Sequence, residues 1–266
     1  MTMPFPNSIS TDKLIRLIGT AKTTLIDVRS DEDFAADARL IPGALRRNHR
    51  EVVEWGGEFA ARPVIVICRN GQQLSHGAAA WLRNAGATAQ VLEGGFEEWK
   101  SAGNPLVPIS KLPARDPLGR TVWVTRARPK VDRIACPWLI RRFVDPAAVF
   151  LYVARTEVAA VGEHFNAAPF DIDNTFFGHR GELCTFDVMV MEFSLSIPAL
   201  LRLATIVRAA DTDRLDLCPE AAGLLAASLG LSRMYTNDLE QLDAGMTLYD
   251  ALYRWCRDAT EETHET

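Results

Sequence analysis

The sequence lacks a long apolar run, an excess of basic residues and paired cysteines. No apolar stretch in its 266 residues approaches the length of about 20 residues that a membrane-spanning helix needs. The N-terminus does not have the pattern of a secretory signal. We therefore expect a cytoplasmic protein without membrane insertion. The net charge of -5 gives no global attraction to nucleic acid, so DNA is a disfavoured partner.

The five cysteines are odd in number, widely separated and free of Cys-x-x-Cys pairs. This pattern indicates neither a disulfide framework nor a structural zinc site. The remaining composition, 48% hydrophobic and 24% charged, is that of a folded protein whose length suits two domains.

Strand-like and helix-like segments alternate in the first half of the chain. Short apolar runs at 23–28, 63–68 and 88–93 predict buried strands. A helix at about 74–85 follows the second run and ends at Gly86, which suits a left-handed cap. This alternation is typical of an α/β fold in which helices flank a parallel sheet.

A proline-rich segment, residues 107–119, predicts a linker between a domain of residues 1–106 and a domain of residues 120–266. The second domain is predicted to be mostly helical α+β. Its expected strands are 121–125 and 148–153, and its expected helices begin near Cys136, with Pro137 in the first turn, and near Ser196, with others at 218–229, 236–243 and 247–258.

Cys68 lies where a buried strand ends and a helix is about to begin. Loop amides and the helix N-terminus should converge on its sulfur, which favours a thiolate and an oxyanion ligand. The alternative is an inert apolar cysteine, but the carboxyl end of a parallel strand favours function. The loop residues expected to bind substrate are Arg69, Asn70, Gly71, Gln72, Gln73 and Leu74.

Three segments, LIDVRSDEDFAADARLIPGA (25–44), VICRNGQQLSHGAAAWLRNAG (66–86) and VLEGGFEEW (91–99), resemble successive motifs of the rhodanese family. The resemblance implies a cysteine, here Cys68, that carries sulfane sulfur as a persulfide. It also implies thiosulfate or another small oxyanion as substrate, a thiol as sulfur acceptor and no required cofactor. Arg29, matched to the family's early strand motif, joins the substrate-binding candidates.

The loop after Cys68 departs from the usual rhodanese pattern. Many members place Arg, Lys or Ser five residues after the cysteine and Ser or Thr next, whereas this chain has Gln73 and Leu74, with Ser75 following. The loop is also one residue longer, which resembles rhodanese-related phosphatases and arsenate reductases, although their loop arginine is missing. Thiosulfate sulfurtransferase activity is therefore expected to be weak, and the sequence leaves open whether the chain is an enzyme.

The segment from Arg120 to Asp145 contains seven basic residues and two acidic ones, so it is positively charged within a chain whose net charge is negative. Guanidinium groups at a strand end suit an oxyanion, and a solvated basic face is the alternative. The oxyanion candidates of the second domain are Arg126, Arg128, Lys130, Arg133, Cys136 and His179.

A loop-rich span further along the chain concentrates residue types that bind metals. His179, Glu182 and Cys184 are candidate ligands, although they match no standard metal spacing. The alternative is that the histidine lies in a loop turn and Asp187 caps a helix, with no metal bound. The sequence therefore does not decide whether this span binds a metal.

Five segments, VWVTRARPKVDRIACPWLIRRFVDPAAVFLYV, HRGELCTFD, RLATIVRAADTDRLDL, AAGLLAASLGLSRMY and GMTLYDALYRWC, resemble the C-terminal domain of ChrB-type chromate-resistance proteins. The resemblance spans roughly residues 120–258 and implies a role in bacterial chromate resistance. One hypothesis is a sulfurtransferase-like protein that carries sulfane sulfur on Cys68 and has an oxyanion-binding C-terminal domain. The other is a chromate-responsive sensor or transcriptional regulator with a non-catalytic rhodanese-like domain.

Overall fold

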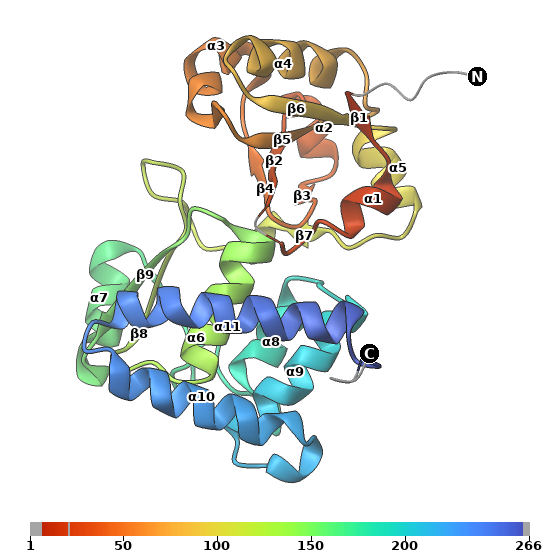
Figure 1. Ribbon diagram of the computed structural model, residues 1–266. Helices are drawn as coiled ribbons and strands as arrows, with labels where there is room; N and C mark the ends of the chain where they lie inside the picture. Colours follow the sequence, from red (N-terminus) through yellow and green to blue (C-terminus); the bar gives the residue numbers. More distant parts are fainter. Residues whose placement is uncertain (1–6, 21, 263–266) are drawn as a thin grey trace. The chain divides into compact units, whose positions relative to one another are not determined.

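The computed structural model describes residues 7–20 and 22–262, which form two compact units (Figure 1). The first unit runs to Ser110 and includes Arg142–Pro146, and the second consists of Lys111–Arg141 and the chain from Ala147 onward. Among the described residues, no helix combines the length and the apolar character that crossing a bilayer requires.

The predicted linker is partly ordered secondary structure. Its first residues form β7 (Val107–Pro108), which pairs in antiparallel fashion with β3 (Arg39–Leu40). Leu40 and Val107 are buried, so the pairing ties the start of this segment to the first unit. The division between the units falls after Ser110, inside the predicted linker.

The first unit is a five-stranded parallel sheet with the strand order β1-β6-β5-β2-β4. This architecture confirms the predicted α/β fold. The strands are β1 (Ser8–Ile9), β2 (Thr24–Asp27), β4 (Ala44–Arg46), β5 (Pro63–Ile67) and β6 (Thr88–Leu92). The helices are α1 (Thr11–Ile15), α2 (Asp31–Ala36), α3 (Val52–Trp55), α4 (Gln73–Asn84) and α5 (Gly95–Ser101), with 3-10 turns η1 (His49–Glu51) and η2 (Gly56–Phe59).

The central strand β5 is buried on both faces. Val64 and Val66 belong to a core cluster that includes Leu82 of α4, and α3 contributes Trp55 to the same cluster. Side chains alternate along a strand, so the equally buried Ile65 lies on the opposite face. This double burial explains why the strand reads as a continuous apolar run.

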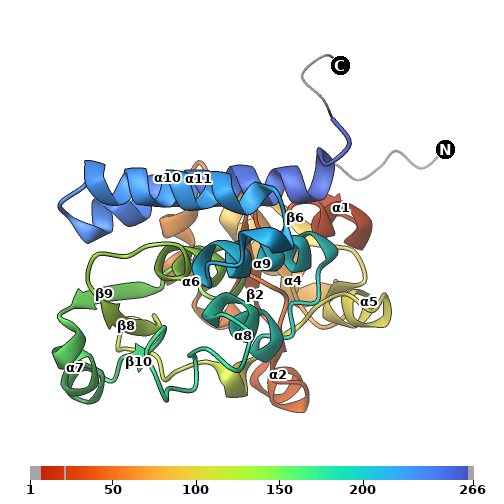
Figure 2. The ribbon, with the colours of Figure 1, turned by 90° about the horizontal axis from the view of Figure 1, so that it is seen from below.

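The second unit combines a three-stranded parallel sheet, in the order β10-β8-β9, with helices. This confirms a mostly helical domain with a small sheet. Its two long C-terminal helices, α10 and α11, pack side by side in Figure 1 and overlap in the view of Figure 2. The strands are β8 (Val122–Arg126), β9 (Val149–Val153) and β10 (Ala168–Pro169). The helices are α6 (Asp132–Leu139), α7 (Val158–Phe165), α8 (Thr185–Glu192), α9 (Pro198–Asp211), α10 (Glu220–Met234) and α11 (Asp238–Asp258), with 3-10 turns η5 (Arg155–Glu157) and η6 (Leu215–Leu217). The 3-10 turn η3 (Ile109–Lys111) spans the division between the units.

The helix that contains Pro137 begins at Asp132 and not near Cys136 as predicted. Pro137 therefore lies inside α6, where proline has no N–H to offer the carbonyl of Arg133, four residues earlier. The hydroxyl of Tyr152, on β9, donates a hydrogen bond of 3.0 Å to that carbonyl. The replacement bond explains how α6 tolerates the proline before it passes into the π-helical segment η4 (Ile140–Val144).

Replacing Tyr152 with Phe should lower the free energy of unfolding of the second unit by about 1 kcal/mol, because the carbonyl of Arg133 loses its donor. Urea denaturation followed by tryptophan fluorescence measures the change. Tyr235→Phe is the matched control because no described residue bonds to that hydroxyl, and equal losses in the two variants would contradict the explanation.

The helices predicted at 236–243 and 247–258 are one continuous helix, α11, so the expected break between them is wrong. Gly245 lies in the middle of this helix, and its missing side chain permits a close approach to α6. A Cβ atom at this position would lie 2.5 Å from Cγ2 of Ile134. Gly245 is thus part of the α6–α11 contact and does not end a helix.

The Gly245→Ala substitution should destabilise the second unit by about 1–3 kcal/mol, because the added methyl group overpacks against Ile134. Gly230→Ala, in α10, is the control because a Cβ there meets nothing within 4 Å, and it should stabilise the protein by up to about 1 kcal/mol. Calorimetric unfolding of both variants tests the prediction, which fails if Gly245→Ala is neutral.

Candidate functional site

Cys68 follows β5 at the carboxyl end of the parallel sheet and is only 4% exposed. The backbone N–H of Gln72 donates to its Sγ at 3.3 Å, and Oγ of Ser75 lies 3.1 Å from the same sulfur. α4 begins at Gln73, so the first N–H groups of this helix, which have no intrahelical acceptors, lie beside the thiol. The predicted convergence of loop, helix end and sulfur is present.

Two glycines let the Cys68 loop pack against the turn before α5. Gly71 has a φ of 65°, and a Cβ there would lie 2.5 Å from the carbonyl oxygen of Leu92. A Cβ on Gly95 would lie 2.3 Å from the carbonyl oxygen of Cys68. The N–H of Phe96 donates to that carbonyl at 2.9 Å, so the glycine-rich motif helps to hold the Cys68 loop in place.

The other predicted loop residues differ in their exposure. Asn70, Gln72 and Gln73 are exposed, and Leu74 packs against the core. Ser75, which was not among the predicted site residues, is buried and supplies the hydroxyl next to Cys68. The hydroxyl thus comes from the seventh residue after the cysteine, one position later than the Ser or Thr of many rhodaneses.

Arg69 lies at the exposed rim of the loop and is already paired with carboxylates. It is 3.1 Å from Asp33 and 3.6 Å from Glu97. These acidic neighbours neutralise its charge, so Arg69 adds little net attraction for a dianion.

Arg29 is a structural residue and not the predicted substrate ligand. It is 1% exposed, and its guanidinium pairs with Asp27 at 2.7 Å. It also donates to the carbonyls of Asp37 and Arg39 and lies over the ring of Phe96. These contacts use its donors to hold the ends of β2 and β3 together.

Gly71→Ala should destabilise the first unit by about 2 kcal/mol or more, because alanine is strained at a positive φ and its methyl group would meet the backbone at Leu92. Gly77→Ala, in α4, is the control because a Cβ there has open space. Calorimetry of the full chain measures both, and unchanged unfolding of Gly71→Ala would contradict the described packing.

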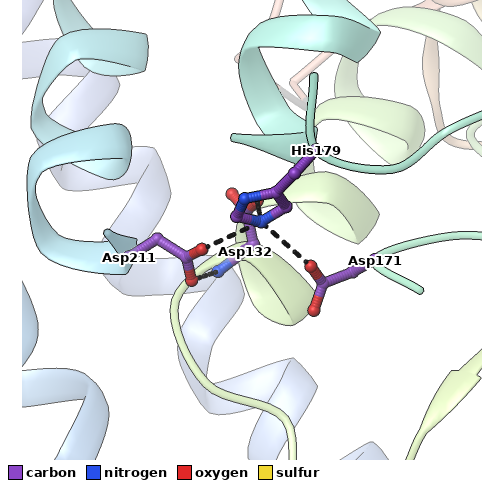
Figure 3. Close-up of side chains that lie close together, drawn as sticks. All are labelled: Asp132, Asp171, His179 and Asp211. Atoms are coloured by element: carbon purple, nitrogen blue, oxygen red, sulfur yellow. Dashed lines mark hydrogen bonds and ion pairs between the residues drawn. The ribbon is translucent and has the colours of Figure 1, made fainter. Parts of the chain in front are cut away.

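A second cluster lies in the second unit, where His179 faces three carboxylates (Figure 3). Nε2 of His179 is 3.2 Å from Asp211, 3.3 Å from Asp171 and 3.5 Å from Asp132. One nitrogen or oxygen atom from each of the four residues lies within 4.8 Å of all the others. Of these four residues, only His179 was among the predicted site residues.

The secondary structure explains how these distant residues meet. Asp171 follows β10 at the carboxyl end of the small parallel sheet, and Asp132 and Asp211 are the first residue of α6 and the last of α9. The first N–H of α8, from Thr185, donates to Oδ2 of Asp132 at 2.6 Å. Helix N-termini stabilise negative charge, so α6 and α8 together hold this buried carboxylate.

The backbone around the cluster is strained at two positions. Val131, directly before Asp132, has a φ of 32°, and Asp171 has a φ of 52°. A positive φ is unfavourable for a β-branched residue such as valine. The hydroxyl of Tyr249 donates to the carbonyl of Val131 at 3.0 Å and helps to hold the turn.

Mutual electrostatics shift the pKa values of the cluster. Hydrogen-bonding interactions with Asp132, Asp171 and Asp211 raise the pKa of His179 to about 12, against the opposing effect of burial. Burial and the nearby carboxylate of Asp211 raise the pKa of Asp132 to about 7. The cluster therefore attracts positive charge strongly.

The predicted oxyanion candidates do not form an anion pocket. Arg126 and Arg133 both face Asp171, at 3.5 Å and 3.2 Å. Arg128 instead donates to the backbone carbonyls of Ser232 and Tyr235. Lys130 is exposed, and Cys136 is a fully buried thiol whose pKa is raised by burial.

The surroundings of His179 correct its predicted oxyanion role, because three carboxylates would repel an anion. The other two predicted metal ligands are not members of the cluster. Glu182 is exposed, and Cys184 is a buried thiol at the start of α8 whose pKa is raised by burial. Asp187 caps this helix, accepting from the N–H of Cys184 at 3.1 Å.

Sequence reasoning missed Asp132 and Asp211 as partners of His179. Asp132 was counted only as an acidic residue within a basic stretch, and Asp211 lies near the end of an apolar helix. A signal was nevertheless present, because three of the segments that resemble ChrB-type proteins each contain one of these three residues.

Comparison with known families agrees with the two units. Residues 123–256, half of the chain, match the family described as ChrB, C-terminal domain. The chain belongs to this family. Residues 10–102 match the rhodanese-like domain, so a rhodanese-like domain precedes the ChrB C-terminal domain.

Individual proteins resemble either part of the chain. Protein ChrB of Cupriavidus metallidurans is 36% identical over 157 residues, which is 58% of this chain and 47% of that protein. The chain thus spans about half the length of this relative. A rhodanese-related protein from Thermoplasma volcanium is 24% identical and covers 38% of this chain and 97% of its own, with a TM-score of 0.34. The human single-domain sulfurtransferase TSTD1 is 24% identical and covers 35% and 95%, with a TM-score of 0.31.

Proposed function

We propose that this protein is a sulfur carrier of bacterial chromate resistance, with Cys68 holding sulfane sulfur as a persulfide. The observation that carries the proposal is the N–H of Gln72, which donates to Sγ of Cys68 at 3.3 Å at the start of α4. Membership of the ChrB C-terminal domain family supports the link to chromate resistance.

Sulfur transfer proceeds by nucleophilic attack in two steps. The thiolate of Cys68 attacks the outer sulfur of thiosulfate, the sulfur–sulfur bond of thiosulfate breaks, and sulfite leaves with the bonding electron pair. A thiolate acceptor then attacks the outer sulfur of the Cys68 persulfide, and the Cys68 thiolate is the leaving group. Each step conserves charge and needs no external oxidant.

The groups around Cys68 suit a negatively charged outer sulfur. N–H groups at the start of α4 are oriented toward this end of the helix, where the helix dipole also favours negative charge. Oγ of Ser75 lies 3.1 Å from Sγ and donates to the carbonyl of Gln72 at 3.0 Å, which helps to hold the loop. The N–H groups at the start of α4 are the dipoles that stabilise the persulfide anion.

The charges at the entrance to the loop should make the reaction of Cys68 with thiosulfate slow. Asp33 and Glu97 neutralise Arg69, so a dianion gains little attraction as it approaches Cys68. A donor with less negative charge than thiosulfate should therefore load the protein faster.

Incubating the full chain with thiosulfate should add the mass of one sulfur atom, as detected by intact-mass spectrometry under non-reducing conditions. Cys68→Ser should abolish the addition, and cyanide should remove it from the wild type. Cys218→Ser is the control, because Cys218 is the one cysteine of the five that is not fully buried, and it should load normally.

Sulfur addition that persists in Cys68→Ser would refute Cys68 as the carrier. If the wild type takes up no sulfur from thiosulfate or from an organic persulfide, the carrier function fails. The protein would then fit the alternative, a chromate-responsive sensor or regulator with a non-catalytic rhodanese-like domain. Arg128 and Arg133 bind backbone carbonyls of their own chain, which gives no support to DNA binding by these arginines.

A further inference from the structure

The cluster of His179 with Asp132, Asp171 and Asp211 combines one imidazole with three carboxylates at a single point (Figure 3). We propose that it binds a divalent first-row transition-metal cation through Nε2 of His179 and at least one carboxylate oxygen from each aspartate. This site is separate from Cys68 and does not depend on the sulfur-carrier function.

The distances from Nε2 of His179 to the three carboxylates match those between metal ligands. Bonds of about 2.0–2.2 Å at tetrahedral angles place two ligand atoms about 3.3–3.6 Å apart. The carboxylate oxygens of Asp211, Asp171 and Asp132 lie 3.2, 3.3 and 3.5 Å from Nε2. All three distances are therefore close to the distance between two ligand atoms of one tetrahedral ion.

Hydrogen bonding alone explains this geometry less well. Nε2 carries at most one hydrogen, which can point directly at only one of three oxygens. A charge-assisted N–H···O bond is typically about 2.7–2.9 Å long, and each of the three observed distances is longer. Nearly equal distances to three oxygens fit a shared cation better than a single donated proton.

One oxygen of Asp132 provides independent support. Asp132 is fully buried, and its Oδ1 has no hydrogen-bond partner among the described residues. A buried carboxylate oxygen without a partner is costly, and an ion or an ordered water is the usual explanation. Oδ2 is the oxygen that faces His179, and a cation that Asp132 binds through both oxygens would satisfy Oδ1 as well.

Two carboxylates of the cluster share His179 as their one cationic partner among the described residues. Asp171 faces Arg126 and Arg133, but neither Asp132 nor Asp211 pairs with a lysine or arginine among residues 7–20 and 22–262. His179 is their shared partner. A divalent cation would neutralise both carboxylates and leave Asp171 to its arginines.

The surrounding bonds orient the ligands as in a built metal site. Thr185 donates through its N–H to Asp132 at 2.6 Å and through its hydroxyl to Asp171 at 3.2 Å. The N–H of Asp132 lies 3.4 Å from Asp211 as a further donor. Such outer contacts fix the direction of carboxylate ligands and raise metal affinity.

The site is open to ions from one side. The side chains of His179 and Asp211 are 42% and 19% exposed, whereas Asp132 is fully buried. An ion can therefore enter past His179, and a further coordination position can stay open to solvent.

The donor set favours Mn²⁺, Fe²⁺ or Zn²⁺ over other common cations. Carboxylates suit Mn²⁺, and imidazole suits Fe²⁺ and Zn²⁺, whereas Mg²⁺ and Ca²⁺ prefer oxygen ligands alone. The buried Cys136 and Cys184 are not members of the cluster, so a thiolate-preferring ion such as Cu⁺ is disfavoured.

Titration of the tag-free full chain with Mn²⁺, followed by calorimetry and by electron paramagnetic resonance, tests the site. The wild type should bind one Mn²⁺ with ¹⁴N coupling from His179, and Zn²⁺ should displace it. Asp211→Asn and His179→Gln should each weaken binding by about 100-fold or more, because removing a direct ligand should exceed the loss caused by an outer-contact mutation. His179→Gln should also abolish the nitrogen coupling.

Asp173→Asn and His164→Gln are matched controls, because both residues are exposed members of the second unit outside the cluster. They should bind Mn²⁺ as the wild type does, as should Cys68→Ser. Circular dichroism checks the fold of each variant, and the nitrogen coupling tests the site in the wild type even if Asp211→Asn does not fold. Failure of the wild type to bind Mn²⁺ and Zn²⁺, or unchanged binding in folded His179→Gln, would overturn the proposal.

Discussion

Burial of the carboxylate of Asp132 is the constraint on which the second unit depends. A fully buried charge needs nearby dipoles and counter-charges, and here they come from elements far apart in sequence. The N-terminus of α8 donates through Thr185, and a loop supplies His179. Because α6 must begin at this point, Pro137 falls inside the helix and Tyr152 must satisfy the carbonyl that the proline leaves.

Both units place their chemistry at the carboxyl ends of parallel strands. Cys68 follows β5 in one, and Asp171 follows β10 in the other. At this edge the chain leaves the sheet, and helices begin with free N–H groups, so side chains can be exposed to a ligand while the strands behind them stay rigid. The first unit has the thiol of Cys68 at this edge, and the second has three carboxylates next to the imidazole of His179.

The sequence predicted what local periodicity and loop position determine. Strands β2, β5 and β6 of the first unit and the position of Cys68 were predictable, because apolar runs and a helix start lie in continuous segments, whereas the short strands β1 and β4 were not predicted. Asp132 and Asp211 are 79 residues apart, and their meeting depends on the packing of α6 and α9, which no local pattern encodes. Likewise, the structural role of Arg29 depends on carbonyls from a neighbouring loop that become its acceptors only in the folded unit.

The thiols of the second unit have a consequence for the proposed role in chromate resistance, because chromate is a strong oxidant. Burial raises the pKa of all four of its cysteines: Cys136, Cys184, Cys218 and Cys256. Oxidation proceeds through the thiolate, so at neutral pH the three buried thiols, Cys136, Cys184 and Cys256, should react slowly, and the partly exposed Cys218 is the one open to oxidants. The fold thereby keeps half of the chain chemically durable under conditions in which exposed, acidic thiols would be consumed.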